Sequence, residues 1–200
     1  KNNGGILKTG IAWIKVSSFE QMPNKLKQII LLRLLISIGG ASWPSNKKKI
    51  NRLIDSLKRE KVIKITLGGC VIEKTISGKI WIYREIKRRC LSVVITPGAK
   101  LRWDNRFEVF QNFDKKLTLE PLGEQGWRKI KGKRAPSLPD IFDFSIPFHA
   151  RITIPVARSL DGDLIIPHFD VMDRFNCERP SNVISCDFRP DASWVCDLKA

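Results

Sequence analysis

The stretch from Thr66 to Glu85, TLGGCVIEKTISGKIWIYRE, holds the residue types that most readily suggest chemistry. Its Gly68-Gly69 pair could bind phosphate, or could present Cys70 as a nucleophile. A phosphate loop normally joins a strand to a helix and aims backbone N–H groups at the anion. Here β-branched residues flank the pair on both sides, and neither Lys-Ser nor Lys-Thr directly follows the second glycine. The glycines therefore predict a turn or bulge between two strands.

Cys70 and the two histidines form no convincing catalytic pair. A nucleophilic cysteine needs a base. The nearest histidine in the sequence is His149, which lies in the apolar context IPFHA, and His168 lies in the similar context IIPHF. These surroundings predict a buried cysteine in a hairpin and structural histidines.

The other cysteines and the acidic residues give only weak indications of a metal site or of catalysis. The five cysteines are an odd number without a C-x-x-C pair, which disfavours zinc and disulfides and predicts free thiols in a reducing cytosol. Acidic residues gather late in the chain without a helical spacing, so a hydrolase is a weak hypothesis. The cysteines are Cys70, Cys90, Cys177, Cys186 and Cys196, and the late acids are Asp161, Asp163, Asp170 and Asp173.

The distribution of charge is the strongest signal. The 200 residues have a formal net charge of +16. Residues 1–60 hold 12 Lys and Arg against 3 Asp and Glu, residues 61–120 hold 13 against 6, and residues 121–200 hold 11 against 11. A localised excess favours a polyanionic partner, because neutralised phosphates release counterions. No apolar run reaches the roughly 18 residues of a membrane span. Because no basic helix also exposes a strong apolar face, we expect nucleic acid rather than a membrane surface as the partner.

Two helices are predicted in the basic half. Apolar residues recur at helical spacing from Asn24 to Ile38, and Gly39-Gly40 ends that segment. A second helix follows the sequence SWPS, with Ser45 as its N-cap.

The second helix has an apolar and a basic face. The apolar face consists of Ile50, Leu53, Ile54 and Leu57, and the opposite face of Lys48, Arg52 and Arg59, with Lys49 at its flank. A basic stripe is usually a solvated face, but in this basic half it is a candidate for phosphate contact.

Strands are predicted for most of the remainder. Residues 6–16 alternate only weakly between apolar and polar side chains and are predicted to form a first strand. Val62–Leu67, Val71–Ile76 and Lys79–Tyr83 are rich in β-branched and aromatic residues, with Ser77-Gly78 at a turn. ITPGAKLRWDNRFEVF, with Pro97-Gly98 as its turn, and KKLTLEPLGEQGW continue the strands, and Asp161-Gly162 separates two more.

The expected fold is α+β, with a small helical subdomain followed by a mostly antiparallel β-rich subdomain. We place the boundary near Lys61, where predicted helices give way to strands. Residues 1–61 are then a helical substrate-binding region, residues 62–170 a β-rich region and residues 171–200 an irregular tail.

Five stretches, spread over roughly residues 31–169, form an ordered set. They are LLRLLISIGGASWPSNKKKINRLIDSLKREKVIKITLGGCVIEK, GKIWIYRE, ITPGAKLRWDNRFEV, LEPLGEQGW and SLPDIF with DGDLIIPHF. In this order they resemble the region that follows the catalytic domain of bacterial tRNA(Ile)-lysidine synthases. Each stretch alone is weakly specific, whereas the ordered set is fairly specific.

The resemblance implies an ATP-dependent ligase that adenylates C2 of the wobble cytidine in a minor isoleucine tRNA and joins lysine there. In that family the Ser-Gly-Gly-x-Asp-Ser loop and the catalytic acids lie in an N-terminal domain, and this chain lacks that motif. We therefore expect ATP and Mg to bind the missing domain, no cofactor in this chain, and no activity of this chain alone. The implied partners are tRNA directly, and lysine and ATP through the missing domain. The expected location is cytoplasmic, and a homodimer is left open.

On this interpretation the basic residues grip the tRNA backbone. The expected RNA-binding residues are Arg33, Lys47, Lys48, Lys49, Arg52, Arg59, Arg102 and Arg106. Trp103 and Phe107 are candidates for stacking a base, although core packing is favoured.

The alternative function is a winged-helix DNA-binding regulator. It would use helix 24–38, basic helix 46–59 and a hairpin wing at 70–83. Against it, Asn46 and Asn51 are the only Asn or Gln side chains near the start of the second helix that could read bases.

Overall fold

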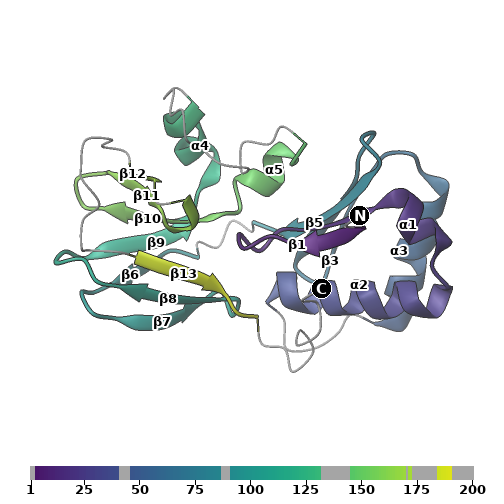
Figure 1. The fold of residues 1–200 in the computed structure, drawn as a ribbon, viewed down its shortest axis with the longest axis horizontal. Helices are drawn as coiled ribbons and strands as arrows, with labels where there is room; N and C mark the ends of the chain where they lie inside the picture. Colours follow the sequence, from purple (N-terminus) through teal and green to yellow (C-terminus); the bar gives the residue numbers. More distant parts are fainter. Residues whose placement is uncertain are drawn as a thin grey trace. The chain divides into compact units, whose positions relative to one another are not determined.

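The computed structural model describes residues 3–40, 46–86, 91–131, 145–169, 171–172 and 184–190. They form two compact units, separated in the chain between Glu85 and Ile86 (Figure 1). Helices and strands are both present, and every strand pairing among the described residues is antiparallel, so the predicted α+β class is confirmed.

Unit 1, up to Glu85, consists of a five-stranded sheet and three helices. The strand order is β1-β2-β5-β4-β3. The strands are β1 (Gly4–Ile6), β2 (Ala12–Lys15), β3 (Ile63–Leu67), β4 (Cys70–Lys74) and β5 (Lys79–Arg84), and the helices are α1 (Val16–Gln21), α2 (Asn24–Gly39) and α3 (Lys47–Arg59).

The helices of unit 1 cover one face of this sheet. Residues an even number apart on a strand point to the same face. On β4, Cys70 Sγ lies 3.6 Å from the Leu35 carbonyl oxygen of α2, and Lys74 Nζ donates to the Leu57 carbonyl of α3 at 2.7 Å. Because Lys74 also approaches Glu20 of α1 at 3.5 Å, all three helices lie on the face of Cys70 and Lys74.

Helix α2 forms where the spacing predicts it, and its buried apolar residues lie mostly in its second half. Leu31, Leu34, Leu35 and Ile38 are buried, whereas Leu26 is 43% exposed. The helix ends at Gly40, whose φ of 61° is the left-handed conformation that favours glycine at this position.

The predicted domain boundary near Lys61 does not match the division of the structure. Strand β2 pairs with β5, so that Ala12 lies opposite Ile82 and Lys15 opposite Lys79. Residues on either side of Lys61 therefore belong to one sheet, and the boundary lies at the end of β5. Local patterns did not reveal this pairing because its partners are more than sixty residues apart in the chain.

Unit 2, from Ile86 to Arg189, contains two sheets. Their orders are β12-β11-β10-β9-β6 and β13-β8-β7. The strands are β6 (Val93–Ile95), β7 (Lys100–Trp103), β8 (Phe107–Gln111), β9 (Leu117–Pro121), β10 (Pro155–Ser159), β11 (Leu164–Ile166), β12 (Val171–Met172) and β13 (Ile184–Phe188). The helices are α4 (Gly123–Lys131), α5 (Phe148–Arg151) and the 3-10 turn η2 (Pro167–Phe169).

The two sheets of unit 2 share one hydrophobic core. The five-stranded sheet contributes Ile95, Leu117, Leu119, Ala157 and Ile165, and the three-stranded sheet contributes Trp103, Phe107, Val109, Ile184 and Cys186. Burial of these apolar side chains, at about 25 cal/mol per Å², holds the sheets together.

Two predictions for unit 2 are wrong in part. GEQGW was expected to continue a strand, but it begins α4. Gly126 weakens the helical pattern; a Cβ there would lie 2.7 Å from Leu122 Cδ1, so a side chain at this position would require the Leu122 side chain to move. The tail was expected to be irregular, but Ile184–Phe188 pairs with β8. Its alternating burial, with Ile184 and Cys186 inside, is a short period-2 pattern that the sequence does contain.

Candidate nucleic-acid interface

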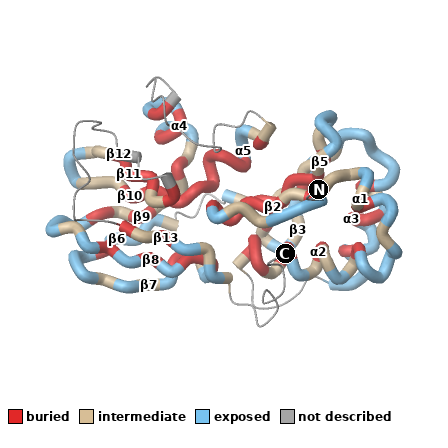
Figure 2. Tube along the Cα trace, in the orientation of Figure 1, coloured by how far each residue is buried: buried red, intermediate tan, exposed pale blue. Residues whose placement is uncertain are grey.

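The outward face of α3 gathers the predicted cations of unit 1. Ile50, Leu53, Ile54 and Leu57 are all at most 3% exposed and turn toward the core. Figure 2 colours α3 by how far each residue is buried. Six basic residues of the helix are exposed; Lys58 donates to Asn24, and the other five, which we call the α3 basic face, are Lys47, Lys48, Lys49, Arg52 and Arg59. Because the core side of α3 is apolar, its cations are held at the surface, as a phosphate-contacting helix requires.

The start of α3 is electrostatically unfavourable for the helix itself. Asn46, not the predicted Ser45, is the N-cap, and its side-chain oxygen accepts from the Lys48 backbone N–H at 2.8 Å; Ser45 lies outside the described residues. The first turn holds Lys47, Lys48 and Lys49 and no acidic residue. Cations at a helix N-terminus oppose the helix dipole, typically by 0.3–1 kcal/mol each. An anion bound there would relieve this repulsion.

Contacts along its length fix the orientation of α3 in unit 1. Gln28 of α2 donates to Asn51 at 2.6 Å, and Lys58 donates to Asn24 at 3.1 Å. Next to Lys58, in the last turn of the helix, the Leu57 carbonyl accepts from the buried Lys74 ammonium, and a cation is favourable at this end of a helix. The α3 basic face is therefore presented on a rigid support.

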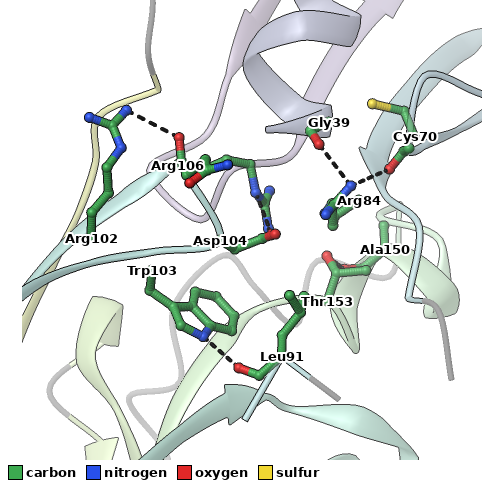
Figure 3. A network of polar contacts seen from close by, with 12 residues as sticks. Gly39, Cys70, Arg84, Leu91, Arg102, Trp103, Asp104, Arg106, Ala150 and Thr153 are labelled. Carbon is green, nitrogen blue, oxygen red and sulfur yellow. Dashed lines mark hydrogen bonds and ion pairs between the residues drawn. The ribbon is translucent and has the colours of Figure 1, made fainter. Parts of the chain in front are cut away.

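The Gly68-Gly69 pair has a structural role. Gly68 and Gly69 have φ of 62° and 74° and form the two-residue turn between β3 and β4, as the sequence predicts. Arg84 donates to the Gly39 and Gly69 carbonyls at 2.7 and 3.1 Å (Figure 3). A Cβ on Gly39 would lie 2.2 Å from the Gly68 carbonyl oxygen, so α2 packs directly on the turn. The carbonyl oxygens of Gly39 and Gly69 accept hydrogen bonds from the Arg84 guanidinium at this turn. Because carbonyl oxygens repel an anion, the turn does not suit a phosphate loop.

Arg33 and Arg102 are exposed, as the sequence reading requires of RNA-binding residues. Arg33 lies on α2, and Arg102 lies on β7 of unit 2. Arg102 Nη2 donates to the carbonyls of Asn105 and Arg189 at 3.1 and 2.9 Å, which fixes its guanidinium at the surface.

Arg106 does not extend a surface track. The residue is 1% exposed, and its guanidinium pairs with the Asp104 carboxylate at 2.6 Å and lies over the Phe107 ring. Trp103 and Phe107 are 2% and 0% exposed, so they belong to the core and cannot stack a base in this fold. Phe110, three residues further along β8 and on its opposite face, is an exposed aromatic residue that the sequence analysis did not single out.

The late acids do not assemble a site among the described residues. Asp161 forms an exposed ion pair with Lys115 at 3.8 Å. Asp170 and Asp173 lie outside the described residues. No group of His, Cys, Asp and Glu in the described ranges has an arrangement that could hold a metal ion. The hydrolase hypothesis gains no support.

Cys70 and Cys186, the two thiols whose side chains the structure describes, are buried. Burial, with a smaller contribution from Asp187, raises the pKa of Cys186 to about 12, while Arg106 opposes the shift. A protonated thiol is a poor nucleophile, so Cys186 is structural.

Cys186 gives unit 2 a defined alkaline sensitivity. In the unfolded chain its pKa is about 8.5, below the folded value, so its contribution to stability is complete below about pH 8 and is lost as pH rises toward 12. We expect the free energy of unfolding to fall by up to about 1.4 kcal/mol per pH unit above about pH 9. Urea titrations of the chain and of Cys186→Ala at several alkaline pH values measure the difference, and equal slopes would contradict the prediction.

The division into two units sharpens the charge map. Residues 1–85 hold 17 Lys and Arg against 5 Asp and Glu, whereas residues 86–189 hold 18 against 13. Most of the excess positive charge thus belongs to unit 1, which carries the α3 basic face. Among the described residues no helix is long and apolar enough to cross a membrane.

No family model matches the chain. The chain is 27% identical over 171 residues to the tRNA(Ile)-lysidine synthase of Rickettsia akari (strain Hartford), covering 84% of this chain and 39% of that protein. It is 26% identical over 171 residues to that of Rickettsia felis, again covering 84% and 39%, and 26% identical over 167 residues to that of Rickettsia bellii, covering 82% and 38%.

The chain thus spans about two fifths of the length of these curated relatives. The match is consistent across them and covers most of this chain. The resemblance indicated by the five ordered stretches is therefore confirmed: over most of its length the chain is similar to a part of tRNA(Ile)-lysidine synthases.

Proposed function

We propose that this chain is the tRNA-binding, C-terminal part of a tRNA(Ile)-lysidine synthase, and that the α3 basic face contacts the phosphate backbone of the tRNA. The observation that carries the proposal is the segregation of α3 into a buried apolar face and an exposed basic one, within the more basic of the two units. The similarity to proteins named tRNA(Ile)-lysidine synthase supports the identity of the polyanion.

In this proposal the whole enzyme ligates lysine to C2 of the wobble cytidine of tRNA(Ile) with ATP. The chemistry belongs to a nucleotide-binding domain outside this chain, which would hold ATP and Mg and receive lysine. The ligation would take place in the cytoplasm, where the tRNA is. In this proposal the described residues bind and orient the tRNA.

The test is the binding of a tRNA(Ile) transcript by the 200-residue chain. If the five cations of the α3 basic face each neutralise a phosphate, the logarithm of the association constant should fall with the logarithm of salt concentration with a slope of about −4. Fluorescence anisotropy between about 50 and 200 mM salt measures the slope. A flat salt dependence would contradict the proposal.

Two further measurements separate the alternatives. The chain should catalyse no ATP–pyrophosphate exchange, and robust exchange would place the chemistry in this chain. Competition with duplex DNA tests the winged-helix regulator: that function requires duplex DNA to displace tRNA at lower concentration than unlabelled tRNA does, whereas we expect the reverse.

A further inference from the structure

The outer face of the three-stranded sheet in unit 2 has an exposed aromatic ring at its centre. Phe110 lies on β8, the middle strand of the order β13-β8-β7, and is 41% exposed. Its neighbours Val109 and Gln111 turn inward and are buried, so Phe110 points away from the core. An exposed phenylalanine in mid-sheet loses the benefit of burial and is a site for a flat apolar ligand.

The residues around the ring are polar or basic. Across the sheet, Lys100 of β7 and Ser185 of β13 lie directly opposite Phe110. Directly opposed side chains on a sheet have Cβ atoms about 4.5–5.5 Å apart. Asn112, exposed just beyond the end of β8, adds an amide that can donate and accept. The ring therefore has a cation on one side and hydrogen-bonding groups nearby.

The charges on this face separate along the strands. Arg102 and Asp187 lie opposite Glu108 on either side, so two carboxylates and one guanidinium leave that end with a net negative charge. At the Phe110 end, Lys100 is exposed and neither residue opposite the ring is acidic. A ligand with a planar apolar part and a negative group beside it matches this end of the face.

We propose that Phe110 stacks an unpaired nucleobase of RNA, with Lys100 placed to contact the adjoining phosphate. A central aromatic residue on an antiparallel sheet is a general solution for single-stranded nucleic acid, because every base has a π-face. Paired bases are already stacked on both sides, so the ligand is a loop or end nucleotide. The inference rests on the proposed function in that the RNA is the tRNA bound through α3.

The test uses the whole 200-residue chain and a fluorescent oligouridine too short to fold. Phe110→Ala is expected to weaken binding of oligouridine roughly tenfold. Phe110→Leu should remain weak although it keeps apolar area, and Phe110→Trp should restore binding, because stacking needs a ring. Val94→Ala is the matched control, since Val94 is 62% exposed on the other sheet of unit 2. It should leave the affinity unchanged.

The outcomes separate this inference from the proposed function. If Phe110→Ala binds oligouridine as well as the unmodified chain does, the inference is wrong. If neutralising Lys48, Arg52 and Arg59 at the same time abolishes the binding of a hairpin RNA, the proposed function is still supported. If the variant with Lys48, Arg52 and Arg59 neutralised binds hairpin RNA normally and Phe110→Ala no longer binds oligouridine, the nucleobase site at Phe110 is supported. The proposed RNA contact of the α3 basic face is then contradicted. If Phe110→Ala weakens the binding of oligothymidine but not that of oligouridine, an RNA site at Phe110 is also contradicted.

A protein partner is the other occupant of such a face. Sedimentation should give the same mass for the chain and for Phe110→Ala; dissociation of a dimer by Phe110→Ala would show that the face contacts protein, and would overturn the inference. Ultraviolet crosslinking of oligouridine, mapped by mass spectrometry, should mark the peptide that contains Phe110. Crosslinks confined to other peptides would likewise overturn it.

Discussion

Neutralising Lys48, Arg52 and Arg59 together as glutamines is expected to weaken tRNA binding by on the order of a hundredfold at low salt. These residues lie on the solvent side of α3, opposite its buried apolar face. Each lost phosphate contact removes a charge-assisted hydrogen bond and the release of about one counterion. The magnitude of the salt slope should therefore fall by about 2–3. Anisotropy titrations at several salt concentrations measure both quantities.

The same variant should remain folded, with α3 about as stable as before. Lys48 lies in the first turn, where its charge opposes the helix dipole, so its neutralisation is favourable by a few tenths of a kcal/mol. Arg59 lies in the last turn, where a cation is favourable, so its neutralisation costs a similar amount. Binding would then fall while helix stability does not, a combination that simple unfolding cannot produce. Circular dichroism and urea denaturation check the fold.

A matched control removes three exposed lysines of unit 2, namely Lys115, Lys116 and Lys129. This variant has the same change in net charge but an intact α3 basic face. We expect a smaller loss of affinity and a steeper remaining salt slope than with the α3 variant. Equal losses in both variants would mean that overall charge, rather than the α3 basic face, determines RNA binding.

Replacing Arg106 by methionine is expected to destabilise unit 2 by about 3–5 kcal/mol. The Arg106 and Asp104 side chains are 2% and 3% exposed and are joined by an ion pair. Methionine fills much of the arginine's volume but leaves the buried Asp104 carboxylate without the Arg106 guanidinium, and the loss of that compensating charge is the main cost. Urea or thermal unfolding of unit 2 measures the loss.

Two variants decide whether the buried charge is the cause. Adding Asp104→Asn to Arg106→Met removes the buried carboxylate charge and should therefore recover part of the stability. Asparagine also tolerates the left-handed backbone of position 104, where φ is 50°. Arg128→Met breaks a pair with Glu124 whose side chains are 78% and 58% exposed, so it should cost little. Similar losses from Arg106→Met and Arg128→Met would contradict this reading.

Local patterns predicted much of the fold because their causes are local. The periodicity of Ile50, Leu53, Ile54 and Leu57 fixes the buried face of α3 and, with it, the exposed position of Lys48 and Arg52. The Gly68-Gly69 turn follows from the positive φ that both positions require. These features depend on residues within one or two turns of each other.

Other features depend on contacts that local patterns do not specify. Arg102 and Arg106 share the sequence LRWDNRF, yet one is exposed and the other is buried against Asp104, because the turn at Asp104-Asn105 directs Arg106 inward. Phe107 and Phe110 are three residues apart on one strand and therefore point to opposite faces. Which of the two faces meets the core is decided by the other sheet.

By itself, the sequence determined that the chain is basic, that the charge is concentrated toward its first half, and that one helix separates cations from apolar residues. Only the tertiary structure decided that residues before and after Lys61 share a sheet, that Arg106 is a core residue, and that Phe110 stands at the centre of an exposed face. The physical reason is range: charge and helical periodicity are properties of neighbouring residues, whereas sheet partners such as β8 and β13 meet only when the chain folds.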